Sequence, residues 1–145
     1  MYRTILVPID GSPLSDGAVD QALQLAKTLD AQVIFVNVIE SYQTFSLDPD
    51  QIAEVARGYE LRAIERAREI LANATLRAEA AGVSSIEVQV GHEYPYEAII
   101  QTATEKKADL IAMASHGRRG MAAVVLGSET VKVLTHSKIP VLVYR

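Results

Sequence analysis

The sequence predicts an α/β protein, a doubly wound parallel sheet with helices on both faces. Two observations predict this class. Short continuous apolar runs, typical of strands buried on both faces, alternate with longer segments of helical periodicity. Turn-forming residues separate these segments. Right-handed crossovers place the intervening helices on the two faces of such a sheet, so the pattern predicts β-α-β-α-β-α-β-α-β. The chain of 145 residues suits a single domain spanning 1–145.

The first strand is predicted at Thr4–Ile9, a continuous apolar run followed by turn-forming residues. A helix follows, with Ser15 or Asp16 as its cap and an end near Leu29, because apolar residues recur there on one helical stripe. The segment Gln32–Ile39 repeats the pattern of a buried strand.

The polar segment Glu40–Gln51 predicts a loop. Helical spacing then continues from about Gln51 to Ala81, and Gly82 ends the helix. Alternating apolar residues from Ile86 to Val90 predict the third strand. Charged side chains three and four residues apart are expected to form ion pairs on the solvent face of the long helix: Arg62, Glu65, Arg66 and Glu69.

Pro95 occupies a favoured first-turn position and predicts a helix that runs to Lys107. Asp109–Ala114 reads as a fourth buried strand, and a glycine-bearing loop follows it. Ser128 is expected to cap a last helix that ends near His136. Ile139–Tyr144 predicts a fifth strand.

The composition excludes several classes of function. The chain has no cysteine, so disulfides, zinc fingers, iron–sulfur clusters and a thiol nucleophile are ruled out. The net charge of −4 argues against a general nucleic-acid binder. No apolar run reaches the roughly 18 residues of a membrane span. The expected location is the cytoplasm, with no membrane partner.

Three segments follow the carboxyl ends of predicted strands, where ligands bind in open α/β sheets: 8–12, 38–41 and 114–128. The third is the most informative. Gly117 and Gly127 allow close approach of backbone amides to an anion, and a helix begins directly afterwards. His116, Arg118 and Arg119 add positive charge there. The alternative is a flexible surface loop beside a capping Ser128.

Individual residues near these ends also allow two interpretations. Asp10 can accept hydrogen bonds from a ribose or adenine, or it can cap the turn that follows it. Met113 is expected in the core rather than as a side-chain ligand. Glu129 would repel a phosphate unless its side chain turns outward. The three histidines show no metal-ligand spacing, and neither G-x-G-x-x-G, a P-loop nor G-x-S-x-G occurs.

Several motifs together carry a resemblance: Ile5-Leu6-Val7-Pro8-Ile9-Asp10-Gly11-Ser12, Ala108-Asp109-Leu110-Ile111, Ser115-His116-Gly117-Arg118-Arg119-Gly120, Leu126-Gly127-Ser128-Glu129-Thr130-Val131 and Ile139-Pro140-Val141-Leu142-Val143. With these motifs the chain resembles the universal stress protein family over essentially its full length. The resemblance implies a Rossmann-like five-stranded parallel sheet in the order 3-2-1-4-5 and a homodimer.

The resemblance also raises ATP, with or without Mg²⁺, as a cofactor. The ATP-binding branch of the family carries G-2x-G-9x-G-[ST], and the register here falls on Ala114, Gly117, Gly127 and Ser128, so the first glycine is replaced by alanine. By resemblance, Asp10 and the backbone of Val38 hold the ribose and adenine. The resemblance implies that the phosphates are bound by Gly117, Gly127, Ser128 and the amide of Glu129. The full set of expected binding residues is Pro8, Ile9, Asp10, Val38, Met113, Ala114, Gly117, Gly127, Ser128 and Glu129.

These expectations describe a cytoplasmic, homodimeric, ATP-binding stress-response protein that regulates an unidentified protein partner and is not an enzyme. Two alternatives stay open. Ala114 motivates a nucleotide-free dimeric interaction module, and a slow ATPase or self-phosphorylating protein fits the same residues. The dimer is expected to pair the apolar strand at Ile139–Tyr144 with its copy, because this strand would otherwise be an exposed edge.

Overall fold

The computed structural model describes residues 1–40, 49–117 and 126–145 of the chain. Its strands form one parallel sheet in the order β3-β2-β1-β4-β5, so the predicted fold class and strand order are confirmed. The elements are β1 (Thr4–Pro8), α1 (Pro13–Leu29), β2 (Gln32–Ile39), α2 (Pro49–Ala81), β3 (Ser85–Gly91), α3 (Pro95–Glu105), β4 (Leu110–Ala114), α4 (Ser128–His136) and β5 (Val141–Tyr144).

Two predicted helix caps are wrong. Helix α1 is capped by Ser12, whose Oγ accepts a hydrogen bond from the Ser15 amide at 3.2 Å, with Pro13 in the first turn. Ser15 instead accepts a hydrogen bond from the Asp10 amide at 3.1 Å. Helix α4 has Gly127 at its N-cap, and Ser128 is already its first helical residue. Both helices therefore begin earlier than the side-chain chemistry of the sequence indicated.

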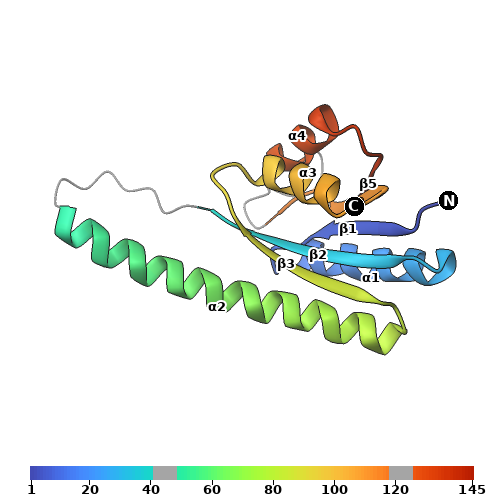
Figure 1. Cartoon of the computed structure of the whole chain (residues 1–145), viewed down its shortest axis with the longest axis horizontal. Coiled ribbons are helices and arrows are strands. Elements are labelled where there is room, and N and C mark those ends of the chain that lie inside the picture. Colours follow the sequence, from blue (N-terminus) through green and yellow to red (C-terminus); the bar gives the residue numbers. More distant parts are fainter. Residues whose placement is uncertain (41–48, 118–125) are drawn as a thin grey trace.

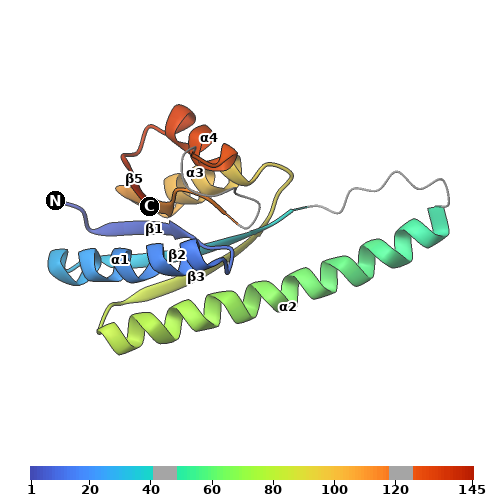
Figure 2. The same ribbon diagram turned by 180° about the vertical axis from the view of Figure 1, so that it is seen from behind.

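The two faces of the sheet carry separate apolar cores. Helices α1 and α2 cover one face, and α3 and α4 cover the other, as the two opposite views show (Figures 1 and 2). Side chains of β1 alternate between them, because Ile5 and Val7 belong to the first core and Leu6 to the second. This burial on both faces explains why the strands read as continuous apolar runs.

Helix α2 is much longer than the sheet that it covers. Its 33 residues span about 50 Å at 1.5 Å each, against about 26 Å for the eight residues of β2. The α2 residues of the core, Leu71, Ala74 and Ala78, pack on the sheet. The N-terminal half extends past the carboxyl ends of the strands (Figure 1). It therefore forms a wall beside the edge where a ligand is expected.

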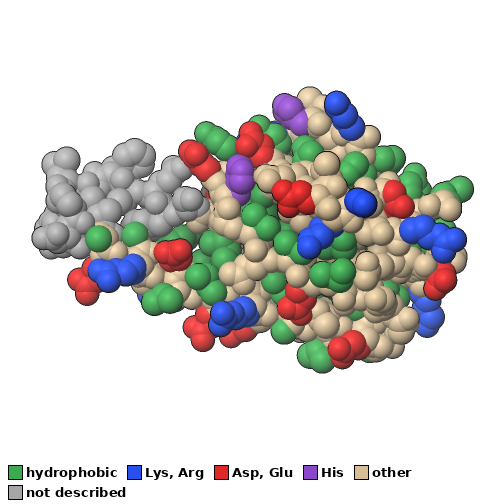
Figure 3. Space-filling model, in the orientation of Figure 1, with side chains coloured by type: hydrophobic (Ala, Val, Ile, Leu, Met, Phe, Trp, Pro, Cys, Tyr) green, Lys and Arg blue, Asp and Glu red, His purple; other side chains and the backbone are tan. Residues whose placement is uncertain are grey.

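The outer surface mixes charges of both signs. On the face that Figure 3 shows, acidic and basic side chains are interspersed over the described elements. In the part of the chain that the structure describes, no helix combines the length and the hydropathy that crossing a membrane requires.

Candidate functional site at the carboxyl edge of the sheet

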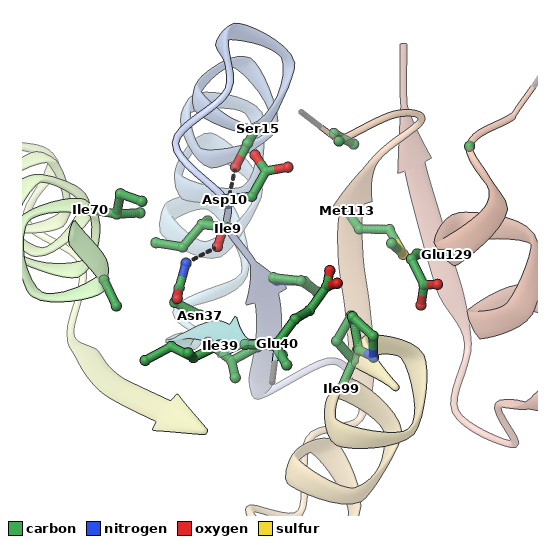
Figure 4. A pocket seen from close by; sticks show the side chains of 18 of the residues that line it. Ile9, Asp10, Ser15, Asn37, Ile39, Glu40, Ile70, Ile99, Met113 and Glu129 are labelled. Carbon is green, nitrogen blue, oxygen red and sulfur yellow. Dashed lines mark hydrogen bonds between the residues drawn. The ribbon is translucent and has the colours of Figure 1, made fainter. Parts of the chain in front are cut away.

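A cavity of about 940 Å³ lies at the carboxyl edge of the sheet, within the range of about 300–1,000 Å³ typical of small-molecule sites. The ends of β1, β2 and β4 form its floor, and α2, α3 and α4 supply its walls (Figure 4). The structure brings all of the residues predicted to bind a ligand to this cavity: Pro8, Ile9, Asp10, Val38, Met113, Ala114, Gly117, Gly127, Ser128 and Glu129. That these residues bind a nucleotide stays a prediction.

The main chain of Val38 points into the space beyond the end of β1. The pairing of β1 with β2 ends at Pro8 and Val36, and the Ile9 amide donates to the Val36 carbonyl at 2.9 Å. Because alternate residues of a strand direct their backbone groups to the same side, Val38 faces the β1 side as Val36 does. Its amide and carbonyl therefore border the cavity where β1 no longer covers them. This is the arrangement needed to hydrogen-bond the edge of a flat heterocycle.

The carboxylate of Asp10 lies at the centre of the site, opposite Gly117. Its Oδ1 accepts a hydrogen bond from the Ser12 amide at 2.9 Å, so the turn-capping interpretation is correct for this oxygen. Its Oδ2 lies so close to Gly117 that a Cβ there would approach it to 2.7 Å. A side chain at position 117 would therefore displace the carboxylate. Glycine at this position keeps Asp10 in place at the cavity floor.

Met113 and Ile9 form the apolar part of the floor. Met113 is 6% exposed and belongs to the core under α3 and α4, as expected, while it also lines the cavity. Ile9 is buried, and its carbonyl accepts a hydrogen bond from Asn37 Nδ2 at 2.8 Å, which fixes the end of β1 against β2 (Figure 4).

The N-terminus of α4 opens onto the same cavity. The Gly127 amide donates to the Ser115 carbonyl at 2.8 Å, and the Thr130 hydroxyl donates to the Ala114 carbonyl at 3.1 Å, so the helix start is fixed to the end of β4. Gly127 has no side chain to cap the helix. The amides of the first turn, starting at Ser128, have no partner within the helix. A helix start of this kind attracts anions.

Glu129 does not lie over these amides. Its carboxylate accepts hydrogen bonds from the Tyr96 amide at 2.9 Å and from Lys132 Nζ at 3.2 Å. It therefore caps the N-terminus of α3, which has no side-chain cap of its own at Tyr94. The expected repulsion between Glu129 and a bound phosphate is thereby relieved, because the carboxylate is turned toward the neighbouring helix. Nearby, the Tyr96 hydroxyl donates a hydrogen bond to the Glu97 carboxylate, and this bond raises the pKa of Tyr96.

The sequence placed His116 among three residues expected to add positive charge after β4, and the structure buries this residue. Its side chain is buried, at 9% exposure, and its Nδ1 lies 3.0 Å from Ser115 Oγ. Its Nε2 is buried and has no hydrogen-bond partner among the described residues. The other two predicted cations, Arg118 and Arg119, lie outside the described residues, as does Gly120.

The wall that α2 contributes was missed in the sequence. Arg62 and Arg66 are exposed, as their positions predicted, and they also line the cavity. The expected ion pairs with Glu65 and Glu69 are not among those of the described residues. The four-residue spacing of the arginines was a visible signal, but their place at the site depends on how far α2 extends past the sheet. Within the described residues, no group of three or more His, Asp or Glu side chains forms a metal site.

Comparisons with known proteins agree with this architecture. A family model described as "Universal stress protein family" matches residues 1–145. The universal stress protein MJ0531 of Methanocaldococcus jannaschii is 32% identical over 149 residues, covering 100% of this chain and 83% of its own. The solved structure of hypothetical protein MJ0577 has a TM-score of 0.82 and 27% identity, covering 99% of this chain and 95% of its own. A universal stress protein solved in complex with cAMP is 32% identical with a TM-score of 0.73, covering 99% and 97% of the two chains.

Proposed function

The chain belongs to the universal stress protein family, and on that premise we propose that it is a regulatory protein that binds an adenine nucleotide, ATP above all, at the carboxyl edge of its sheet. The uncapped start of α4 beside Gly117 and Asp10 is the observation that carries this proposal. A related protein of 32% identity has been solved with cAMP, which is itself an adenine nucleotide.

The residues present fit such a ligand in three places. The backbone of Val38 offers a donor and an acceptor for the base, and Asp10 can accept hydrogen bonds from ribose hydroxyls. The first-turn amides of α4 can bind phosphate oxygens, and the Ser128 hydroxyl can reach an accompanying Mg²⁺ ion. A Cβ at Gly127 would lie 3.2 Å from the Ser115 carbonyl oxygen, so close approach at this point depends on glycine. The fraction of protein with ATP bound would then serve as the regulatory signal.

Nucleotide that accompanies the protein from cells tests the proposal directly. The protein is purified without added nucleotide and denatured, and the released small molecules are separated by chromatography. We expect an adenine nucleotide in a fixed ratio to protein, and calorimetric binding of ATP to the emptied protein. Failure of ATP, ADP, AMP and cAMP to bind at millimolar concentration would instead favour a nucleotide-free interaction module.

The cytoplasmic location expected from the sequence stays a prediction.

We expect turnover of ATP, if any, to stay well below the range of about 1 to 10³ per second common for enzymes. Fast phosphoryl transfer needs a base or an oriented water near the phosphate. Glu129 was the candidate base, but its carboxylate already accepts hydrogen bonds from Tyr96 and Lys132. A steady-state phosphate-release assay measures the rate. Turnover above about one per second that Glu129→Gln abolishes, with ATP binding retained, would show an ATPase instead.

We also propose a homodimer through the free edge of β5, which lies at the end of the sheet. The carbonyl of Pro140, just before β5, accepts a hydrogen bond from the Ile111 amide of β4, and the Tyr144 carbonyl accepts one from the Ser115 amide just after β4. Even-numbered residues of β5 therefore direct their backbone groups to β4, and Val143 directs its own outward. Val143→Pro removes the outward-facing amide N–H of this residue and leaves the hydrogen bonds between β5 and β4 intact. The variant is therefore expected to sediment as a monomer in sedimentation velocity. Wild type should sediment as a dimer at micromolar concentration.

The opposite edge of the sheet offers a matched control for the dimer. The Ser84 carbonyl and the His92 amide both hydrogen-bond to β2, so even-numbered residues of β3 direct their backbone groups toward β2. Gln89 is odd-numbered, and its backbone groups therefore point away from β2. Gln89→Pro should therefore leave the dimer unchanged. A wild-type monomer, or equal loss of the dimer in both variants, would contradict pairing through β5.

A further inference from the structure

The α2 wall of the cavity carries two positive side chains whose role the proposed function leaves open. The lining residues of this helix recur every three or four positions and so lie on one face: Tyr59, Arg62, Ala63, Arg66, Ala67 and Ile70. Ala63 and Ala67 are small, so the arginines are the long side chains of this part of the wall. Helix α2 extends past the sheet (Figures 1 and 2), and both arginines line the cavity.

Within the described part of the chain, Arg62 and Arg66 lack ion-pair partners of the kind that Lys132 and Arg77 have. Lys132, which also lines the cavity, pairs with Glu129 at 3.2 Å. Arg77, further along α2, pairs with Asp16 and Asp20 of α1. For Arg62 and Arg66, no ion pair occurs among the described residues. Two guanidinium groups thus remain available on a wall of a cavity that also holds an anion-attracting helix start.

The two positive features lie on different sides of the same space. In Figure 4, Ile70 marks the α2 side, Glu129 marks the α4 side, and Asp10 lies between them. A ligand whose first phosphate binds at α4 still has further phosphates to neutralise. A guanidinium group matches phosphate oxygens in a two-pronged geometry that an ammonium group lacks.

We propose that Arg62 and Arg66 bind the outer phosphates of the nucleotide, so that the site selects a nucleoside triphosphate over a monophosphate. This inference rests on the proposed function and deepens it. According to this inference, the preference for the number of phosphate groups on the ligand is determined by α2, which lies outside the glycine-bearing loop. The arginines act as binding residues and take part in no bond-breaking step.

Calorimetric titrations of adenosine, AMP, ADP and ATP test the inference. They use the wild-type protein and the double variant Arg62→Ala/Arg66→Ala. In wild type the affinity should rise with each added phosphate. In the double variant we expect ATP to bind about tenfold or more weakly, because hydrogen bonds to charged groups are lost, while adenosine affinity is unchanged. Arg68→Ala is the matched control, since this exposed α2 arginine does not line the cavity.

The outcomes separate the inference from the proposed function. Equal losses for adenosine and ATP in the double variant would place the arginines against the base and overturn the phosphate assignment. Unchanged ATP affinity in the double variant, or an equal loss in Arg68→Ala, would overturn it as well. If wild type binds ATP normally in those cases, the proposed function stands. If wild type binds no adenine ligand at all, the proposed function fails and the inference fails with it.

Discussion

ATP at one hundred times its Kd is expected to raise the free energy of unfolding of the wild-type protein by about 2.7 kcal/mol. In Gly117→Ala the same ATP concentration should give about 1.4 kcal/mol or less, the value for tenfold weaker binding. The reason is the contact between a new Cβ and Asp10 Oδ2, which would be only 2.7 Å apart. The carboxylate must move, and its hydrogen bonds to a ribose are lost. Urea unfolding with and without ATP measures both values.

The unliganded Gly117→Ala protein should unfold close to wild type, because the group that must move is the end of a flexible side chain. Gly17→Ala in α1 is the matched control. Apart from its chain neighbours and the backbone of its own helical turns, no described heavy atom lies within 4 Å of a Cβ built at Gly17, so the same chemical change is expected to preserve the full ATP effect. An ATP effect of equal size in Gly117→Ala and wild type would contradict the assignment of this site.

Most of the fold was predictable because burial on both faces leaves a strong signal. A strand such as β1 has no polar face, so it appears in the sequence as a continuous apolar run. Helix starts were harder to predict. Ser12 and Ser15 both have the side chain of a cap, and only their contacts show that Ser12 caps α1 while Ser15 supports the Asp10 turn. The sequence alone offers two equivalent hydroxyls.

The candidate site was predictable to the extent that strand ends define it. In a parallel sheet all carboxyl ends meet at one edge, so Asp10, Val38 and Ala114 could be expected together. The rest depends on contacts between distant segments. The orientation of Glu129 is set by the Tyr96 amide, 33 residues earlier, and no local pattern reveals that bond. Similarly, Arg62 reaches the site only because α2 is longer than the sheet requires.

The junction between β4 and α4 should respond to substitution differently from Gly117, because backbone atoms surround it. A Cβ at Gly127 would lie 3.2 Å from the Ser115 carbonyl oxygen and 3.3 Å from His116 Cα. Ser115 cannot shift easily. Its amide donates to the Tyr144 carbonyl at 2.8 Å, and its own carbonyl accepts from the Gly127 amide at 2.8 Å. An added side chain therefore strains two elements at once.

Gly127→Val is accordingly expected to lower the free energy of unfolding of the unliganded protein by about 1–3 kcal/mol, the usual cost of overpacking, and to abolish the ATP effect. A β-branched residue is also a poor N-cap, which adds to the loss. Denaturant unfolding should show a lower midpoint with an unchanged slope. Ser128→Ala, one residue further, is the control and should keep the wild-type midpoint, since Gly127, and not Ser128, is the N-cap of α4. A wild-type midpoint in Gly127→Val would mean that the N-terminus of α4 can shift to accommodate a side chain at position 127. The proposal of a rigid anion site would then be wrong, because a helix start that moves away from β4 cannot hold its amides against the cavity.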